Sequence, residues 1–464
     1  MFIELGLKDA SILRTLFSNQ MRTREKNMGK ANLKPAFNDD LTGLPKINLL
    51  RNVITDYIVR RSCNQTAGGD RFALVYLDIN NFTFLNETYG YKVCDKVIKY
   101  LAEYLAAKVI EPNYVTRVTS DKFAILCTGI ETKEQIYDLI EDIISDGCHI
   151  CFTDYVFYIT LSAGIALFPE HGRDIDTLMK KAEMAGYLAK KSGKDIVLYS
   201  DELQKDMVEQ VQLINKLQNG IEKEEFTLFY QPEYNLNTNE IIGVEALVRW
   251  PHPENGFISP DVFIPIAEKT KQIYSLERWI INEALQQKVQ WEEMGLANIE
   301  LSINLSSKTL ESESNFQRIE EIISTYQVDY TKIIFEITET IILTQVDLAV
   351  ERLNRLRAYG IKIALDDFGT GYSSLTHIMK LPIDIIKIDK SFIQSIPHGN
   401  EETVITQNIL SLARELNFRV VAEGIETQEQ LDYLKTASCE RGQGYLLCKP
   451  LPGKRIDEVL LHQG

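Results

Sequence analysis

Acidic and amide side chains stand at or near the ends of successive apolar runs in the second half of the chain. They are Glu245, Asn304, Glu336, the pair Asp366 and Asp367, and Glu423. If each run is a strand and the strand ends meet at one mouth, these oxygen atoms form a site for hard cations such as Mg²⁺ or Mn²⁺. Such cations, held by carboxylates, commonly assist the cleavage of phosphodiester bonds. The pattern therefore predicts a phosphodiesterase.

Each of these residues also has a simpler interpretation when it is taken alone. A glutamate at a strand end is usually a solvated rim residue, and Lys387 alone would be a surface lysine. An Asp-Asp pair lies more often near the start of a helix than at a metal. To replace the metal site, all of these simpler interpretations would have to be true at once, for residues that follow one another in the expected order. The metal site is therefore favoured.

The elements that must position these side chains follow residue 225. The strand candidates are Phe226–Tyr230, Ile241–Val248, Ile299–Leu305, Ile333–Ile337, Ile361–Asp366, Ile383–Ile388, Arg419–Glu423 and Gly444–Leu447. Helical spacing separates most of them, as in Ser275–Met294, Val346–Ala358 and Glu402–Leu416. Residues 225–464 are therefore predicted to form a modified TIM (β/α)₈ barrel, which carries chemistry at its strand C-terminal ends.

Residues 38–200 alternate strand-like and helix-like segments, which predicts a compact α/β sandwich of the nucleotide-polymerising type. Strands are expected at Phe72–Ile79 and Val156–Phe168, and a hairpin at Tyr114–Cys127 with its tip at residues 119–122. Helices are expected at Val93–Val109, Glu134–Ile144 and Ile175–Lys191, the last closed by Gly193.

Two further segments complete the predicted organisation. Residues 201–224 keep helical apolar spacing without Pro or a Gly-Ser run, which predicts a connecting helix. Residues 1–37 have helical spacing at Ile12, Leu13, Leu16 and Phe17 and then a polar, basic stretch. A short helix for dimerisation or signalling and a poorly ordered tail are both open for this segment.

The overall charge argues against two classes of partner. The formal net charge of the 464-residue chain is −16, so its surface repels nucleic acid and anionic lipid unless a local basic patch overrides it. No apolar run is long enough for a membrane span, and the N-terminus lacks the pattern of a signal peptide. Seven scattered cysteines fit reduced thiols, and we expect a cytoplasmic protein. Cys148 and Cys151 form a Cys-x-x-Cys pair with only His149 close by, so thiols in or beside a strand are favoured over a metal site.

The second half resembles the EAL domain family. Glu245-Ala246-Leu247 is the motif that names it, and residues 366–375 match its signature loop without a substitution. Further matches lie at residues 230–232, 303–306, 336–339, 387–389, 422–424 and 443–445. The resemblance implies hydrolysis of cyclic di-GMP to linear pGpG with two Mg²⁺ or Mn²⁺ ions, commonly in a homodimer.

The resemblance also implies a role for each site residue. Glu245, Asn304, Glu336 and Asp366 would hold one metal, and Asp366, Asp367 and Glu423 the other. Lys387 would lie near the attacking water and the phosphate, and either Lys387 or Glu423 could handle the proton. The positions expected to hold the substrate are Gln231, Leu247, Arg249, Asp389 and Gln443, and Glu339 would anchor the signature loop.

The first half resembles the GGDEF family of diguanylate cyclases, with matches at residues 40–45, 78–82 and 182–190. The signature itself is changed to Thr119-Ser120-Asp121-Lys122-Phe123, and the second acid of an Asp-x-Asp pattern is Asn80. Side chains at residues 119 and 120 add bulk where glycines would let the backbone approach a nucleotide, and Lys122 puts a cation beside a metal position. We therefore predict a degenerate domain with little or no cyclase activity.

Several pieces of that family's site are nevertheless present: Asp78, Asn86, Asp95, Asp121 and Lys190. They would permit GTP to bind and regulate the second half, although a structural domain that binds nothing is equally open. The family's Arg-x-x-Asp product site would fall at residues 110–113 and is absent. The rival to the hydrolase is a receptor that binds cyclic di-GMP without cleaving it.

Overall fold

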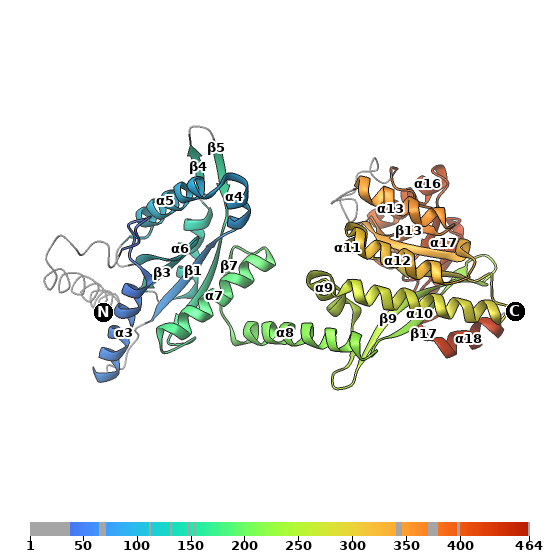
Figure 1. Ribbon diagram of the computed structural model, residues 1–464, viewed down its shortest axis with the longest axis horizontal. Helices are drawn as coiled ribbons and strands as arrows, with labels where there is room; N and C mark the ends of the chain where they lie inside the picture. Colours follow the sequence, from blue (N-terminus) through green and yellow to red (C-terminus); the bar gives the residue numbers. More distant parts are fainter. Residues whose placement is uncertain are drawn as a thin grey trace. The chain divides into compact units, whose positions relative to one another are not determined.

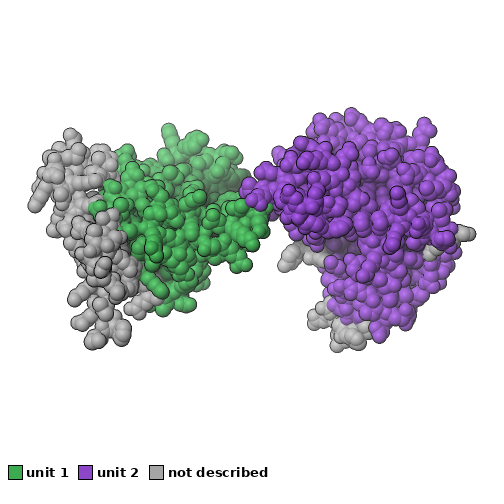
Figure 2. Space-filling model, turned by 90° about the horizontal axis from the view of Figure 1, so that it is seen from below, with its two compact units in different colours: residues 1–209 green, residues 210–464 purple. Residues whose placement is uncertain are grey.

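The computed structural model describes residues 38–64, 71–110, 113–129, 132–145, 148–152, 155–339, 346–369, 379–396 and 400–462. The predictions for residues 1–37 and for most of the loop after Gly369 therefore lie outside the described residues. The chain divides into two compact units, residues 1–209 and 210–464 (Figures 1 and 2). The division falls within α8 (Asp201–Glu222), a continuous helix over most of the segment predicted as a connecting helix.

The first unit is a five-stranded sheet in the order β2-β3-β1-β6-β7 with helices on both faces. Its strands are β1 (Phe72–Ile79), β2 (Tyr114–Thr119), β3 (Lys122–Thr128), β6 (Leu161–Phe168) and β7 (Ile196–Leu198). The helices are α3 (Ile47–Asn64), α4 (Phe82–Tyr89), α5 (Tyr91–Lys108), α6 (Lys133–Ser145) and α7 (Ile175–Ser192). Since successive strand side chains point to opposite faces, Leu74 and Tyr76 pack under α3 and α7, while Val75 and Leu77 pack under α5 and α6.

The prediction of one strand over Val156–Phe168 is wrong. The chain forms β5 (Tyr155–Ile159), which pairs with β4 (Cys148–Phe152) in a separate two-stranded sheet, and then β6 in the main sheet. The break is at Thr160, whose backbone oxygen accepts a hydrogen bond from Asn80 N at 2.9 Å. Both halves are apolar, so the sequence pattern does not reveal the change of partner. The Cys148–Cys151 pair lies in β4, as the simpler interpretation predicts.

The other elements predicted for this unit are confirmed, with ends that differ by a few residues. The hairpin of β2 and β3 has its tip at residues 119–122, where Thr119 lies opposite Lys122. Helix α7 begins after Asp174, whose carboxylate accepts a hydrogen bond from Thr177 N, and it ends at Gly193 in the left-handed conformation (φ 69°).

The second unit is an eight-stranded barrel with an antiparallel first strand. Its sheet runs in the order β9-β11-β12-β13-β14-β15-β16-β8 and closes through a β8–β9 pair, with β10 and β17 added outside. The strands are β8 (Thr227–Asn235), β9 (Ile241–His252), β10 (Gly256–Ile258), β11 (Glu300–Asn304), β12 (Ile333–Thr338), β13 (Lys362–Phe368), β14 (Ile385–Ile388), β15 (Arg419–Ala422), β16 (Arg441–Gly442) and β17 (Leu451–Pro452). From β9 to β16 the barrel strands are parallel, so their C-terminal ends share one mouth.

Helices surround the barrel and bury its outer face (Figure 1). They are α9 (Pro260–Thr270), α10 (Ile273–Glu293), α11 (Ser307–Glu311), α12 (Glu313–Thr325), the 3₁₀ turn η1 (Tyr330–Lys332), α13 (Val346–Ala358), α15 (Lys390–Gln394), α16 (Asn400–Glu415), α17 (Gln428–Thr436) and α18 (Gly453–His462). None of the helices in the described ranges combines the length and the apolarity that a membrane crossing needs.

The prediction of a strand at Gly444–Leu447 is also wrong. The eighth strand is β16, two residues upstream, and residues 445–447 form a turn. The backbone of Gly444 lies against Ile425, where an added Cβ would meet Ile425 N at 2.2 Å. The turn that follows is tied to the same residue, because Leu446 N donates a hydrogen bond to Ile425 O at 2.9 Å.

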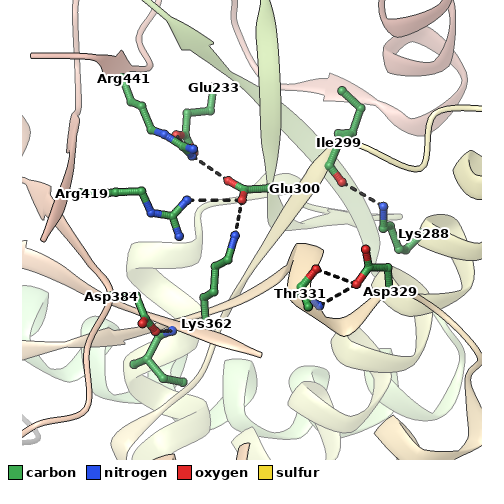
Figure 3. A network of polar contacts seen from close by, with 11 residues as sticks. Glu233, Lys288, Ile299, Glu300, Asp329, Thr331, Lys362, Asp384, Arg419 and Arg441 are labelled. Carbon is green, nitrogen blue, oxygen red and sulfur yellow. Dashed lines mark hydrogen bonds and ion pairs between the residues drawn. The ribbon is translucent and has the colours of Figure 1, made fainter. Parts of the chain in front are cut away.

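The barrel interior has layers, because every second residue of each strand points inward. Ile334, Ala364, Ile385 and Val421 form a buried apolar cluster separate from the helix-facing core. At the strand N-terminal ends lies an ion network of Glu300 with Lys362, Arg419 and Arg441, shown in Figure 3, in which Lys362 and Arg419 stand two residues before Ala364 and Val421. Two residues after the members of the apolar cluster, at the opposite mouth, lie Glu336, Asp366, Lys387 and Glu423. A thin apolar layer thus separates two charged ends.

Candidate active site

Lys387 lies at the centre of the acidic residues at the barrel mouth. Its Nζ is 2.6 Å from Glu423 Oε1, 2.8 Å from Glu336 Oε2, 3.0 Å from Glu245 Oε2 and 3.7 Å from Asp366 Oδ1. All these side chains come from different strands or strand ends and are largely buried. The barrel therefore brings together four carboxylates that are up to 178 residues apart in sequence, from Glu245 to Glu423.

Two amide side chains complete this group. Gln443 Nε2 donates hydrogen bonds to Glu245 Oε2 at 2.7 Å and to Glu423 Oε1 at 2.9 Å. Asn304 Nδ2 donates to Glu245 Oε1 at 3.0 Å. The seven side chains named so far were all predicted as site residues, and the structure places them in one contact network.

The electrostatics of the group are dominated by an excess of negative charge. Burial raises the pKa of Glu336 well above its ordinary value, and Glu245 adds to the effect. Burial, with Asp366 and Glu245 nearby, raises the pKa of Glu423 to about 8 although Lys387 acts in the opposite direction. Burial opposes the ionisation of Glu245 too, but Lys387 and the two amides outweigh it and lower the pKa of Glu245. One lysine therefore does not neutralise all these carboxylates, and the mouth favours further positive charge.

The Asp366–Asp367 pair depends on an irregularity in β13. The register with β14 advances three residues on β13, from Leu365 to Phe368, but only two on β14, which is a β-bulge. Asp367 takes a left-handed backbone conformation (φ 54°) that is costly for a side chain bearing Cβ. Burial, with Asp366 and Asp389 nearby, raises the pKa of Asp367 to about 6.

Glu339, the residue predicted to anchor the signature loop, contacts the backbone directly after β13. Its Oε2 accepts a hydrogen bond from Gly369 N at 3.2 Å. Gly369 has φ 98°, and an added Cβ would meet the Phe392 ring at 2.9 Å, so only glycine fits there.

The oxygen atoms at the barrel mouth are of the kinds that bind divalent cations, although they do not surround a metal position in this structure. Five carboxylates and an amide oxygen at a single barrel end are ligands that Mg²⁺ and Mn²⁺ prefer. Within the described ranges, no three acidic, histidine or cysteine side chains already converge on a metal position. Instead, the ammonium of Lys387 lies among the carboxylates.

A cavity of about 370 Å³ opens beside this group. Asn304, Glu336, Asp366 and Asp367 line one side, together with Leu247 and Arg249 from β9. This size is within the range of small-molecule sites. Arg249 lies with its guanidinium 5.8 Å from the Phe229 ring centre and donates to Val248 O.

Three predicted substrate residues are not among the residues that line the cavity. Gln231 is buried and donates to Cys448 O at 3.3 Å. Asp389 caps α15 by accepting from Ser391 N at 3.0 Å. Gln443 lies behind the cavity, in the carboxylate group.

The far wall of the cavity contains residues that the sequence analysis missed. Pro260, Ile264 and Pro265 give it an apolar surface, and Glu268 and Glu277 add two carboxylates. Ser306, two residues after Asn304, donates to Glu268 Oε1 at 2.6 Å through its hydroxyl and to Glu277 through its backbone N–H. Both glutamates lie on helices α9 and α10, where an isolated acid suggests solvent exposure, so only the fold shows that they face the cavity.

Comparison with known families identifies the second unit. A family model described as the EAL domain matches residues 214–450, more than half of the chain. The chain belongs to the EAL family. A second model, described as the diguanylate cyclase GGDEF domain, matches residues 36–195, so a GGDEF unit precedes the EAL unit.

Related proteins share this tandem arrangement. The chain is 32% identical over 425 residues to the bifunctional diguanylate cyclase/cyclic di-GMP phosphodiesterase MucR of Pseudomonas aeruginosa, covering 91% of this chain and 61% of that protein. It is 30% identical to the cyclic di-GMP phosphodiesterase PdeR of Escherichia coli, covering 89% of this chain and 62% of that protein. The chain thus spans about three-fifths of the length of these two relatives. A solved structure named PaMucR phosphodiesterase, c-di-GMP complex, is 36% identical with a TM-score of 0.51 and covers 53% of this chain and 99% of its own.

The predicted nucleotide residues of the GGDEF unit lie around the C-terminal end of β1. Asp78 is the second-last residue of β1 and contacts Lys190 of α7, with Oδ1 and Nζ 2.7 Å apart. Asn86 lies on α4, and its Oδ1 is buried with no hydrogen-bond partner among the described residues. Asp95 is an exposed residue of α5, and Asp121 lies at the tip of the β2–β3 hairpin.

Proposed function

We propose that the EAL unit hydrolyses cyclic di-GMP to linear 5'-pGpG with the help of two Mg²⁺ or Mn²⁺ ions. The observation that carries this proposal is the gathering of Glu245, Glu336, Asp366 and Glu423 around Lys387, beside a cavity of small-molecule size. The names of the relatives support it, because both include cyclic di-GMP phosphodiesterase and the similar solved structure is a complex with that nucleotide.

The metal ligands are proposed as the sequence predicts them. Glu245, Asn304, Glu336 and Asp366 would hold one ion, and Asp366, Asp367 and Glu423 the other. When bound, the two ions supply Lewis-acid polarisation of the phosphoryl oxygens and a lower pKa for the attacking water. The bulge at Asp366 and Asp367 allows consecutive acids to serve one site.

The chain's own residues supply positioning and charge. The carboxylates around Lys387 favour its charged form, which suits stabilisation of charge that develops on the phosphate. Arg249 offers a planar guanidinium to a phosphate oxygen pair, and Leu247 offers an apolar wall. Gln231, Asp389 and Gln443 are proposed to contact the substrate or to orient the groups that do.

We further propose that the GGDEF unit is a regulator that binds GTP but lacks cyclase activity. The buried, unpartnered Oδ1 of Asn86 supports nucleotide binding, because a buried acceptor without a donor is costly unless a ligand supplies one. Lys122 at a metal position argues against catalysis. We also propose that the protein is a homodimer, which light scattering of the purified chain would test.

The first test is incubation of the purified chain with cyclic di-GMP and Mg²⁺ or Mn²⁺, with and without GTP, followed by chromatography of the nucleotides. Linear pGpG that disappears with EDTA is expected, and faster release with GTP would support the regulatory role. Unchanged cyclic di-GMP under every condition would instead favour the receptor. Cyclic di-GMP formed from GTP alone would overturn the loss of cyclase activity.

A further inference from the structure

Two lysines and two acids form a cluster at the C-terminal end of β1 in the GGDEF unit. Lys190 Nζ lies 2.7 Å from Asp78 Oδ1 and 3.1 Å from the backbone oxygen of Ile79. Lys122 Nζ lies 3.5 Å from Glu183 Oε1, which also accepts a hydrogen bond of 2.8 Å from the Tyr76 hydroxyl. We call Asp78, Lys122, Glu183 and Lys190 the lysine cluster.

Lys122 and Asp78 stand directly opposite each other on β3 and β1. Residues paired in this way on antiparallel strands point to the same face and have Cβ atoms about 5 Å apart. Lys122 therefore extends from the same face of the sheet as Asp78, where the family resemblance places an acidic metal ligand, and its ammonium contacts Glu183. Lys190 pairs with Asp78, and Lys122 lies across the strand from it, so the position of that expected metal ligand carries two cationic side chains.

Asn80, the residue that replaces the second acid, is also engaged elsewhere. Its Nδ2 donates to Thr160 Oγ1 at 3.1 Å, and its Oδ1 accepts from Ser162 Oγ at 2.9 Å. These bonds hold both ends of the amide at the β5–β6 break. The residues of this site therefore do not fit a divalent cation.

The same residues fit a polyanion. Lys122 and Lys190 offset the charges of Asp78 and Glu183, while Asp121 adjoins the cluster at the hairpin tip, so the two ammonium groups are the part of this site that attracts a triphosphate. The side chains of Lys122 and Lys190 are 33% and 37% exposed, so phosphate oxygens can reach them. Ion pairs this exposed are weak, and exchanging a carboxylate for a phosphate costs little. Asn86, on the helix that begins three residues after β1, has an unpartnered acceptor that an N–H of the guanine base, and not a phosphate, could satisfy.

We propose that the ammonium groups of Lys122 and Lys190 replace the divalent cation in this unit, so that it binds GTP without metal and leaves it intact. This inference rests on the proposed binding of GTP to the GGDEF unit and adds how the triphosphate is held. Its consequence is that nucleotide occupancy of the regulatory unit does not depend on the Mg²⁺ or Mn²⁺ that the EAL unit needs.

The test is equilibrium dialysis of GTP against the full chain in EDTA and in excess Mg²⁺. We expect the two Kd values to agree within about threefold. Lys122→Glu should weaken binding in EDTA by more than about tenfold, and Mg²⁺ should restore it, because the substitution recreates an acidic pair with Asp78. Lys180→Glu, the same charge change on an exposed position of α7, is the matched control and should change neither value.

The outcomes distinguish a failure of the proposed GTP binding from a failure of the proposed metal-free site. Absence of GTP binding in both conditions would overturn the proposed regulator itself. Binding that requires Mg²⁺ in the unsubstituted chain would preserve GTP binding and overturn the metal-free site. Metal-independent binding that Lys122→Glu does not affect would place the nucleotide elsewhere. Circular dichroism of each variant shows whether lost binding reflects lost folding.

Discussion

The carboxylate of Glu339 accepts a hydrogen bond from the backbone amide of Gly369, with Oε2 and N 3.2 Å apart. The bond ties the end of β12 to the bulged end of β13, one residue beyond Phe368 and two beyond Asp367. Because Asp367 has a strained backbone, its position depends on contacts such as this one.

Glu339→Gln is therefore expected to lower turnover by about 10–100-fold and to raise the Mg²⁺ concentration needed for half-maximal rate. An uncharged amide accepts the Gly369 bond less strongly, so the two aspartates are held less accurately. Steady-state rates over a Mg²⁺ titration measure this, with the exposed Glu321→Gln on α12 as the control. Wild-type metal dependence in Glu339→Gln would remove the anchoring role.

Substitution of Glu245 tests the metal site more directly. Glu245 contacts Lys387, Gln443 and Asn304, and it is a proposed ligand. Glu245→Ala should reduce pGpG formation below detection and weaken Mn²⁺ binding in calorimetry. Turnover at the unsubstituted rate would contradict the site assignment, provided that circular dichroism shows a folded variant.

Removal of Lys387 should affect rate and stability in different ways. Lys387→Ala is expected to slow turnover by about 10²–10³-fold through loss of charge stabilisation at the phosphate. Without metal, it also leaves Glu336 and Glu423 buried with no cation, so the variant should melt at a lower temperature in EDTA. Mg²⁺ should raise its Tm by more than it raises that of the unsubstituted chain. An equal rise in both would show that the lysine and the metals do not act on the same carboxylates.

The elements that carry this site could be predicted well from the sequence, because apolar strands ending in acids are a local pattern. What could not be predicted are features set by long-range packing. The β-bulge that separates Asp366 from Asp367 arises from the pairing of β13 with β14. The turn at Gly444 arises from contact with Ile425, and the cavity wall at Glu268 and Glu277 arises from α9 and α10 folding over the mouth.

Glu277 gives a pH-dependent prediction. Burial raises its pKa from 4.5 to about 8, although Thr309 and Ser306 donate hydrogen bonds to it and act in the opposite direction. Between the unfolded pKa and the folded pKa, the folded state binds more protons, so stability falls as the pH rises from 4.5 to about 8. At about 1.4 kcal/mol per pKa unit, the upper bound on this loss is about 5 kcal/mol.

The measurement is urea unfolding followed by tryptophan fluorescence, which reports on the EAL unit because Trp250, Trp279 and Trp291 all lie there. The unsubstituted chain should be less stable at pH 8.5 than at pH 6, and Glu277→Gln should reduce that difference. If Glu277→Gln does not change how the free energy of unfolding depends on pH, other groups cause that dependence.

The ion network at the opposite end of the barrel should stabilise the fold without affecting catalysis (Figure 3). Burial opposes ionisation of Glu300, but hydrogen bonds and charge from Arg441 and Lys362 lower its pKa from 4.5 to about 2. Its contribution is therefore present above pH 4.5 and is lost as the pH falls toward 2. Glu300→Gln should reduce the free energy of unfolding at pH 7 by up to about 3 kcal/mol, because it removes the buried carboxylate that three partly buried cations share. Glu311→Gln, which breaks the more exposed pair with Lys308, should cost less than about 1 kcal/mol.

The apolar layer of Ile334, Ala364, Ile385 and Val421 separates Glu300 from the carboxylates at the mouth. The kcat of folded Glu300→Gln should therefore equal that of the unsubstituted chain. A kcat that falls in Glu300→Gln while Tm is unchanged would show that this network acts on the active site through the barrel interior.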